Sequence, residues 1–496
     1  MLGIFTDIIS IRRKVFAEVA SIAYEDRPLS ELPKSVFNIL PGEEAKYRHD
    51  IFKERAIVGE RIRLAMGLDV RSAGVYGPLT DGVEEVDVNE RIYEAPLINV
   101  IPFACEACPT KTYEVTTHCR RCIGHPCQNI CPVNAISLDK KKANIDQSKC
   151  IKCGRCKDVC PYSIIVMYDR PCAVSCGVNA IGSDELGRAK IDHDKCVSCG
   201  NCMQACPFSA IADKSQIYQL VKALKSNNNI YAIIAPAFVG QFGPMASPSQ
   251  VFEAIRRLGF KQVVEVGLGA DIETIHEAQE FLDEVPHKRP YMGTSCCPAW
   301  FGMVRKMFPD QLPYISESAT PMIATAHYLK KKDPESKVVF IGPCVAKKLE
   351  ALDDNVKDYV DFVITFEELF GLFIAKDIEP SEIETDEIIN DASTVGRGFA
   401  AAGGVANAVS RVAKQLDPSA VIQIESANGL HECVKMIRLA KAGKKNGMLL
   451  EGMGCEGGCI GGAGTVISMA QARKALQQFS NEAKATLSTE NELIKK

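Results

Sequence analysis

The spacing of cysteines constrains the fold of this chain more than any other feature. Sixteen of its 22 cysteines lie between residues 105 and 206, most of them separated by two or three residues. A disulfide scaffold of this density is typical of a small secreted domain, whereas this chain has 496 residues, of which 46% are hydrophobic. We therefore interpret the thiols as metal ligands and expect a cytoplasmic protein in a reducing compartment.

Two groups of four cysteines follow the run with which bacterial ferredoxins bind 4Fe-4S clusters, and a proline follows each group. They are Cys150, Cys153, Cys156 and Cys160 before Pro161, and Cys196, Cys199, Cys202 and Cys206 before Pro207. In such a run the fourth cysteine binds the other cluster, so the spacing predicts that Cys206 completes the first group and Cys160 the second. Structural zinc sites normally pair two C-x-x-C units across a long spacer, which makes zinc the weaker interpretation.

The remaining clustered cysteines indicate one or two further sites. A third group with one wider spacing consists of Cys119, Cys122, Cys127 and Cys131. Four more cysteines are Cys105, Cys108, Cys172 and Cys176. These four leave three interpretations open: a fourth cluster with Cys131 and Cys176 exchanged between sites, a zinc site, or structural thiols. The repeated phrases CPVNAI, CGVNAI and CPFSAI indicate a ferredoxin-type module used more than once, which would conduct electrons.

Three segments of the chain differ in their sequence pattern. Residues 1–100 show helical periodicity without cysteine, residues 101–215 are loop-rich, and residues 216–496 alternate helices with apolar strands. We therefore predict an α+β multidomain protein with a mainly helical N-terminal segment and a ferredoxin-like iron-sulfur module. The third segment is predicted to be an α/β domain with largely parallel sheets, whose functional loops follow the carboxyl ends of its strands.

Charge and hydropathy exclude two classes of partner. With 58 Lys and Arg against 62 Asp and Glu, the net charge of −4 gives no basis for binding nucleic acid. No apolar run reaches the roughly 18 residues that a membrane helix needs, so we expect a soluble protein without a membrane partner. The first residues lack a basic leader and a cleavage site, so we expect no secretory signal.

Six cysteines lie beyond residue 290, five of them in the segments TSCCPAW, IGPCVAKKLE and EGMGCEGGCIGGAG, which follow apolar runs. If the strands bring these segments together, Cys297, Cys344, Cys455 and Cys459 share one buried pocket suited to an iron-sulfur cluster. The glycines around Cys459 would let the backbone approach a bulky cofactor. Cys433 has helical spacing and is predicted to be a core thiol.

The three segments resemble, in order, the three signature motifs of the iron-iron (FeFe) hydrogenases, and the ferredoxin tetrads precede them as in that family. The resemblance covers about residues 150–470. It implies an H-cluster, which is a 4Fe-4S cubane joined to a two-iron centre that carries CO, cyanide and an azadithiolate bridge. It also implies that Cys297, Cys344, Cys455 and Cys459 hold the cubane and that Cys459 bridges to the two-iron centre.

The same resemblance implies roles for other residues near the pocket. Cys296 resembles the family's proton-donor thiol, and the onward relay is matched by Glu277, Glu280 and Ser316, with Glu317 as an additional acid. Lys347 resembles the lysine that hydrogen-bonds a cyanide ligand, with Glu350 as its motif partner, while Pro236 and Met453 match residues at the pocket. Periodicity alone would instead place the two relay glutamates on a solvated helix face.

Several positions depart from the family pattern without changing any implied iron ligand. Gly342 replaces the usual Met of the second motif, Ala237 replaces a Ser, and residues 319–321 read Ala-Thr-Pro in place of Lys-Ser-Pro. Because residues around the ligands set the potential and reactivity of a metal centre, we expect a divergent subgroup with altered catalytic bias.

The resemblance implies a hydrogenase that interconverts protons plus electrons with dihydrogen. Its implied partners are a ferredoxin or similar low-potential electron carrier and the maturases that assemble the H-cluster. Two alternatives remain: a redox or hydrogen sensor that keeps the H-cluster with low turnover, and an iron-sulfur carrier or assembly protein. The assembly proteins of this type lack the relay cysteine, so the presence of Cys296 favours the enzyme.

Overall fold

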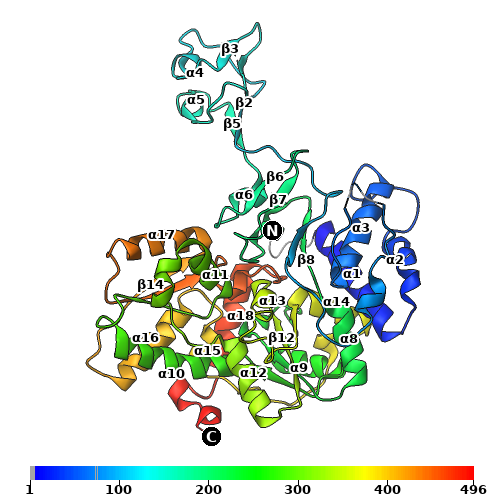
Figure 1. The fold of residues 1–496 in the computed structure, drawn as a ribbon, viewed down its shortest axis with the longest axis vertical. Helices are drawn as coiled ribbons and strands as arrows, with labels where there is room; N and C mark the ends of the chain where they lie inside the picture. The colour runs from blue at the N-terminus through cyan, green and yellow to red at the C-terminus, as the bar shows by residue number, and fades with distance from the viewer. Residues whose placement is uncertain (1–5, 73, 75, 496) are drawn as a thin grey trace.

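The computed structural model describes residues 6–495 apart from residues 73 and 75, and it has an α+β architecture (Figure 1). Three N-terminal helices lie beside a large α/β domain, and two small iron-sulfur modules extend from these parts toward the top of the view. The predicted fold class, with small sheets followed by parallel sheets, is confirmed. Among the described residues, no helix is long and apolar enough to cross a membrane.

Two parallel sheets form the framework of the α/β domain. The strand order is β10-β9-β12-β13 in one sheet and β11-β15-β14 in the other. The strands of the first are β9 (Ile230–Ile234), β10 (Gln262–Glu265), β12 (Lys337–Gly342) and β13 (Phe362–Thr365). Those of the second are β11 (Met292–Gly293), β14 (Gln423–Asn428) and β15 (Met448–Met453). Most of β9, β12, β13 and β15 is buried, as continuous apolar strands covered by helices on both faces should be.

Helices connect these strands and cover the sheets. They are α8 (Ile217–Ser226), α9 (Pro248–Arg257), α10 (Gly267–Glu284), α11 (Pro298–Met307), α12 (Pro321–Lys332), α13 (Ala346–Glu350), α14 (Phe366–Ala375), α15 (Thr394–Gly398), α16 (Gly404–Leu416), α17 (Leu430–Lys441) and α18 (Met469–Asn481). Their starts follow local sequence signals: Ser247 caps α9 in a capping box with Gln250, and Thr365 caps α14 in the same way with Glu368.

The N-terminal helices are α1 (Asp7–Tyr24), α2 (Leu32–Ile39) and α3 (Ile51–Ala65). The apolar face of α1, including Val15, Val19 and Ile22, is buried against α8 and α14 of the large domain. The helical segment therefore shares one hydrophobic core with the sheet β10-β9-β12-β13.

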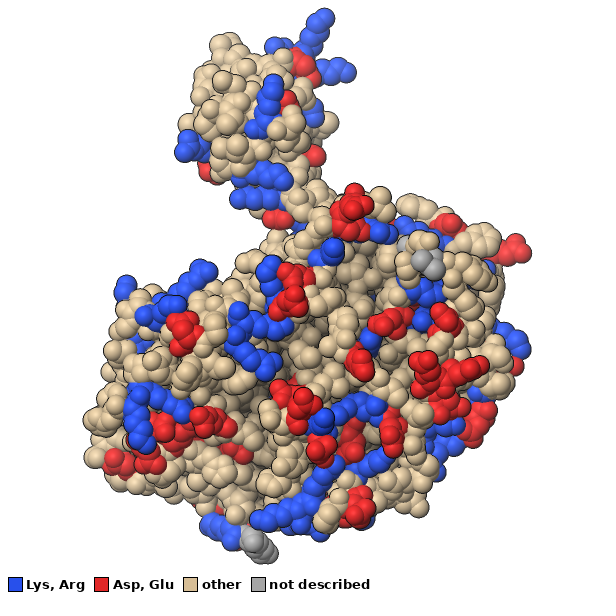
Figure 2. Space-filling model, in the orientation of Figure 1, with Lys and Arg blue, Asp and Glu red and all other residues tan. Residues whose placement is uncertain are grey.

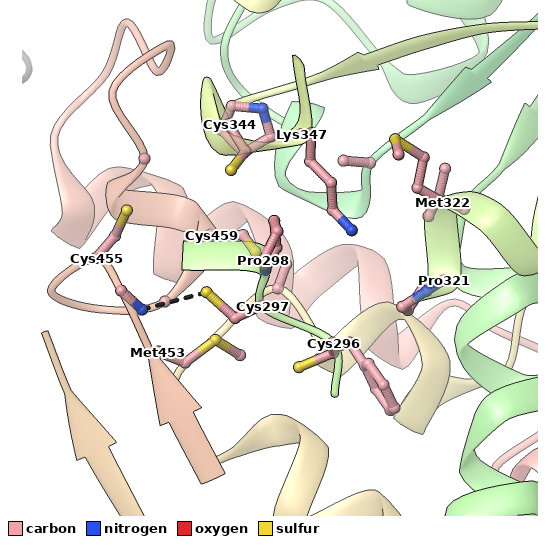
Figure 3. A pocket seen from close by; sticks show the side chains of 18 of the residues that line it. Cys296, Cys297, Pro298, Pro321, Met322, Cys344, Lys347, Met453, Cys455 and Cys459 are labelled. Atoms are coloured by element: carbon pink, nitrogen blue, oxygen red, sulfur yellow. Dashed lines mark hydrogen bonds between the residues drawn. The ribbon is translucent and has the colours of Figure 1, made fainter. Parts of the chain in front are cut away.

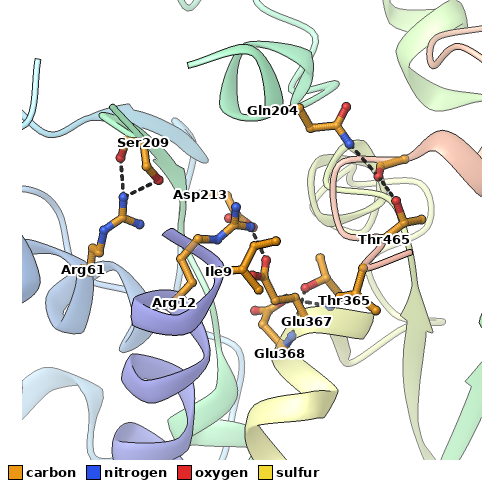
Figure 4. Close-up of polar contacts among 12 residues, drawn as sticks. Ile9, Arg12, Arg61, Gln204, Ser209, Asp213, Thr365, Glu367, Glu368 and Thr465 are labelled. Atoms are coloured by element: carbon orange, nitrogen blue, oxygen red, sulfur yellow. Dashed lines mark hydrogen bonds and ion pairs between the residues drawn. The ribbon is translucent and has the colours of Figure 1, made fainter. Parts of the chain in front are cut away.

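Buried polar contacts join these parts (Figure 4). Arg12 of α1 pairs with Glu367 of α14, and Arg61 of α3 donates to the Ser209 hydroxyl at 2.6 Å. Lys348 is fully buried, with its Nζ 2.7 Å from Asp213 Oδ2 and 2.9 Å from Glu368 Oε1. The contacts of Ser209 and Asp213 fix the end of the cysteine-rich region against α3 and the large domain.

Replacing Lys348 with methionine is expected to destabilise the protein by about 3–5 kcal/mol, because two buried carboxylates would lose their cation. Anaerobic urea unfolding measures the effect as a lower midpoint than in the Lys331→Met control, which removes an exposed lysine from the end of α12. Equal midpoints for the two variants would contradict a structural role for this ion cluster.

The cysteine-rich region, predicted as one segment over residues 101–215 with a repeated ferredoxin-type unit, contains two modules. The outer module, residues 110–169, contains β2 (Thr112–Val115), α4 (Pro126–Asn129), β3 (Ile136–Leu138), β4 (Ala143–Ile145), α5 (Arg155–Asp158) and β5 (Ile165–Tyr168). The inner module, residues 96–109 and 170–215, contains β1 (Ile98–Val100), α6 (Pro171–Val174), β6 (Ile181–Ser183), β7 (Ala189–Ile191), α7 (Asn201–Ala205) and β8 (Ile211–Asp213). The antiparallel pairs are β2-β5 and β3-β4 in the outer module, and β1-β8 and β6-β7 in the inner one.

This division corrects the predicted exchange of Cys160 and Cys206. Cys160 lines a small cavity in the outer module together with Cys119, Cys122 and Cys127. Cys206 packs instead beside Cys105 in an apolar cluster of the inner module. The prediction was wrong because it treated the two tetrads as one ferredoxin unit, whereas the chain places them in different modules.

Candidate active site

Loops at the carboxyl ends of parallel strands converge on one pocket between the two sheets (Figure 3). Pro236 follows β9, and Cys344 follows β12 in the first sheet. From the second sheet, the loop after β11 supplies Cys296 and Cys297, while the loop after β15 supplies Cys455. In parallel sheets these ends lie on one side, which explains how distant motifs meet.

The structure thus brings together the residues that the sequence motifs singled out. The sulfur and charged groups of the pocket are Cys199, Cys296, Cys297, Cys344, Cys455, Cys459, Met322, Met453 and Lys347. The other lining residues, such as Val266, Phe340 and Phe399, are apolar or glycine, so the pocket is a poor environment for water.

Two observations indicate that the pocket residues fit an iron-sulfur cofactor. The four motif thiols, those of Cys297, Cys344, Cys455 and Cys459, face one cavity. The backbone N–H of Gly454 donates to Cys297 Sγ at 3.3 Å, the kind of bond that tunes cluster sulfurs. The backbone also closes tightly around the loop after β15: a Cβ on Gly458, which has φ +85°, would lie 2.5 Å from Ala402 N. Only glycine allows this approach.

Lys347 supplies the one cation of the described pocket lining, and its side chain reaches into the cavity (Figure 3). Its Nζ lies 2.8 Å from Glu350 Oε2, but the angles do not suit a hydrogen bond. The other carboxylate oxygen of Glu350 accepts from Thr320 Oγ1 at 2.6 Å. Burial lowers the pKa of Lys347, but the Glu350 carboxylate, together with the nearby thiols of Cys344 and Cys296, leaves the pKa above its usual value. The side chain is therefore an ammonium with hydrogen-bonding capacity to spare.

Glu277 of α10 lies next to the Cys296 loop and is 1% exposed. Its Oε1 accepts from the backbone N–H of Ser295 at 2.9 Å and from the Ser295 hydroxyl at 3.2 Å. Its Oε2 has no hydrogen-bond partner among the described residues. Burial raises the pKa of Glu277 to about 7, so this carboxyl can take up or release a proton near neutral pH.

Glu280 lies one helical turn further along α10 and is partly exposed. Its Oε2 accepts from Ser316 Oγ at 2.5 Å, and its Oε1 lies 2.9 Å from Arg289 Nη1. Arg289 also lies 3.7 Å from Glu317, whose side chain is 89% exposed. Periodicity alone predicts that Glu277 lies on a solvated helix face. This prediction is wrong, because the carboxyl group of Glu277 is buried.

One of the departures from the pattern of the resembled family has a structural explanation. A Cβ on Gly342 would lie 2.5 Å from the ring of Phe340, so this ring occupies the space of the usual methionine and lines the pocket itself. The structure does not explain the second departure, Ala237, whose backbone carbonyl accepts from Gln241 Nε2 at 3.1 Å.

The inner module contacts the pocket directly. Cys199 is one of the lining residues, and Asn201 of α7 donates to the carbonyl of Gly454 at 3.1 Å. Gln204 donates to the carbonyl of Gly462 at 2.9 Å (Figure 4). An iron-sulfur site at Cys199 would therefore adjoin the cofactor pocket.

Sequence reasoning missed three residues of this site. Ser295 stands beside Cys296 in the chain, and its position could have identified it. Arg289 and Phe340 carry no such signal, because the first lies in an irregular loop and the second resembles any buried strand residue.

Comparison with family models gives three matches. The model described as iron only hydrogenase large subunit, C-terminal domain, matches residues 228–463. A 4Fe-4S binding domain matches residues 189–212, and an LdpA Fe-S cluster-binding domain matches residues 117–169.

Individual relatives are similar to this chain at low identity. Iron hydrogenase 1 of Clostridium pasteurianum is 28% identical over 375 residues, which cover 65% of this chain and 65% of that relative's length. The periplasmic [Fe] hydrogenase large subunit of Nitratidesulfovibrio vulgaris is 27% identical over 64% of this chain and 85% of its own. The cytosolic Fe-S cluster assembly factor NAR1 of Yarrowia lipolytica is 36% identical over 140 residues, which cover 24% of this chain and 28% of its own. A solved variant of the [FeFe]-hydrogenase HydA1 from Chlamydomonas reinhardtii has 25% identity and a TM-score of 0.46, covering 56% of this chain and 92% of its own.

Proposed function

We propose that the chain is a hydrogenase that interconverts protons plus electrons with dihydrogen. The proposal is supported by the match of residues 228–463 to the iron only hydrogenase large subunit, C-terminal domain, and by the matches of two iron-sulfur domain models before it in the chain. The observation that carries the proposal is the juxtaposition of four thiols with a fifth, Cys296, that adjoins a buried titratable carboxyl. Hydrogen chemistry needs both a redox centre and a proton donor at one place.

In this proposal the pocket holds an H-cluster. Its cubane would be ligated by the thiols of Cys297, Cys344, Cys455 and Cys459. The last of these, Cys459, would be shared with the two-iron centre. When bound, the group would supply an open metal site and reversible electron storage. The Lys347 ammonium would hydrogen-bond an anionic ligand, while Pro236 and Met453 would shape the apolar wall.

The chain's own residues would move the proton. The apolar lining excludes water, so a proton needs side chains to cross the protein. Cys296 would exchange it with Glu277, whose pKa near 7 suits both directions. Ser316 and Glu280 would pass it on to the surface at Glu317.

Electrons would enter through the iron-sulfur modules from a ferredoxin-like carrier. The outer module stands away from the rest of the molecule on a narrow neck, with lysines and arginines on its surface (Figure 2). Residues 110–169 contain ten Lys and Arg against five Asp and Glu, although the whole chain is acidic. An acidic electron carrier would be steered to this surface, and salt would weaken the attraction.

The similarity to NAR1 supports one alternative, an iron-sulfur assembly role. The enclosed Glu277 and the Glu280 contacts favour the hydrogenase, because a cluster carrier has no need of a proton path from a buried thiol.

Anaerobic expression with and without the hydrogenase maturases tests the proposal. Matured protein is expected to evolve dihydrogen with a reduced viologen dye and to oxidise it with an oxidised dye, and protein made without maturases is not. A matured protein with its full iron content but no turnover in either direction would refute the hydrogenase and favour the sensing or assembly role.

A further inference from the structure

In the two modules, four C-x-x-C loops that each begin a cysteine group share one unusual backbone conformation. In each, the residue before the second cysteine has a left-handed φ, which is uncommon for residues other than glycine. These residues are Ala107 (+46°), Arg121 (+46°), Lys152 (+57°) and Ser198 (+53°). The loop of Cys105 and Cys108 therefore has the conformation of the three loops that open complete cluster motifs.

The turns after the fourth cysteines repeat in the same way. The third residue after each of these cysteines has a left-handed φ: Asn134 (+49°), Ser163 (+52°), Asn179 (+51°) and Ser209 (+49°). The backbone N–H four residues after the cysteine donates to its sulfur at Cys131 (3.2 Å), Cys176 (3.2 Å) and Cys206 (3.3 Å). Cys176 therefore occupies the position of a fourth cysteine, although its motif looks incomplete in the sequence.

One further bond aligns the two modules. In the outer module, the N–H of Ala143 at the start of β4 donates to Cys119 Sγ at 3.5 Å. In the inner module, the N–H of Ala189 at the start of β7 donates to Cys105 Sγ at 3.3 Å. Cys105 thus holds the place in the inner module that Cys119, the first cysteine of a tetrad, holds in the outer one.

The outer module interrupts the inner motif between Cys108 and Cys172. Its first and last strands pair, with Thr112 opposite Tyr168, so the chain leaves and returns at one point. Arg170 is 3% exposed and secures this point, because it donates to the carbonyls of Cys108 (2.9 Å), Gly182 (2.6 Å) and Gly187 (2.6 Å).

We propose that residues 110–169 are a complete two-cluster ferredoxin module inserted into the first cysteine motif of a second two-cluster module, and that Cys105, Cys108 and Cys172 hold a fourth 4Fe-4S cluster together with Cys206. The other inner cluster then takes Cys196, Cys199, Cys202 and Cys176. The outer clusters take Cys119, Cys122, Cys127 with Cys160, and Cys150, Cys153, Cys156 with Cys131.

Packing and donor spacing support these sets. Cys206 and Cys105 share one apolar cluster, and Cys172 and Cys105 share another, so all three adjoin one region of the inner module. A single zinc ion would gather its thiolates at about 2.3 Å. Within residues 6–495, excepting 73 and 75, no three His, Cys, Asp or Glu side chains are close enough to hold one ion. That spacing favours a cubane over zinc.

The proposed cluster would be the junction of the electron path. Its ligands Cys108 and Cys172 flank the point where the outer module leaves the chain, while Cys199 of the other inner cluster lines the active-site pocket. Electrons from the outer pair would therefore cross this cluster before they reach the pocket. This inference rests on the iron-sulfur part of the proposed function and not on hydrogen turnover.

The Cys172→Ala variant tests the fourth cluster by iron and sulfide analysis of anaerobically purified protein. It is expected to lose about four iron and four sulfide per chain relative to the wild type, with hydrogen chemistry playing no part in the readout. The matched control is Cys433→Ala, which removes a buried thiol of α17 that belongs to none of the sets. Loss of zinc instead of iron, or iron content equal to the control, would overturn the proposal.

If the alanine variant does not fold, the conservative Cys172→Ser variant still tests whether Cys172 is a cluster ligand. Cys172→Ser offers an oxygen ligand, so it is expected to keep its iron and to change the paramagnetic resonance signal of one reduced cluster. An unchanged spectrum would count against ligation by Cys172. If the wild type shows four accessory clusters but no hydrogen turnover, the proposed enzyme fails while the inserted-module proposal stands.

Discussion

Replacing Cys296 with alanine is expected to lower hydrogen turnover by about 10²–10⁴-fold, the range that a positioned proton donor contributes. The thiol lines the cofactor pocket and adjoins Glu277 through Ser295, yet it is not among the four implied iron ligands. Turnover with a viologen dye, per H-cluster counted by its infrared bands, measures the change.

The control for this variant is Cys433→Ala, which also removes a buried thiol of the same domain. It is expected to keep hydrogen turnover near that of the wild type. Cys296→Ala protein that carries the assembled cofactor and retains full turnover would contradict the relay role of Cys296. Loss of the cofactor itself would show that the thiol is needed for assembly instead.

Replacing Glu277 with glutamine is expected to lower turnover by about 10²-fold or more, because the amide cannot exchange a proton. The variant keeps an oxygen that can accept from Ser295, so the loop should retain its position. Asp283→Asn is the matched control, since it removes an exposed carboxylate from the same helix. Equal losses in both variants would contradict a specific role for Glu277.

Glu277 also gives the protein a pH dependence that can be observed without turnover. Burial raises its pKa from 4.5 to about 7, so the folded protein binds this proton more tightly than the unfolded chain does. The contribution of this site to folding stability is therefore complete below about pH 4.5 and is lost as pH rises through about 7. The infrared carbonyl band of the protonated carboxyl should disappear over the same rise and be absent in Glu277→Gln.

The parallel-sheet architecture was accessible from the sequence because buried parallel strands appear as continuous apolar runs. Strands β9, β12 and β15 show this pattern. Motif cysteines directly follow β12 and β15, so the meeting of Cys344 and Cys455 could be foreseen. The chemical groups of the site therefore come from residues that directly follow strands in the sequence.

The pairing of iron-sulfur ligands was not accessible in this way. The outer module separates Cys108 from Cys172, so the inner motif appears in the sequence as two unrelated halves. The strand pairing, the left-handed turns at Ala107 and Asn179, and the N–H bonds to the cysteine sulfurs relate them to complete motifs. The burial of Glu277 was equally hidden, because helix periodicity cannot specify which neighbour covers a face.

Infrared spectroscopy of the anaerobically matured protein tests the central claim most directly. Stretching bands of bound CO and cyanide are expected in protein made with the maturases and absent from protein made without them. Matured, iron-replete protein that shows neither band would contradict an H-cluster in this pocket and, with it, the proposed hydrogenase.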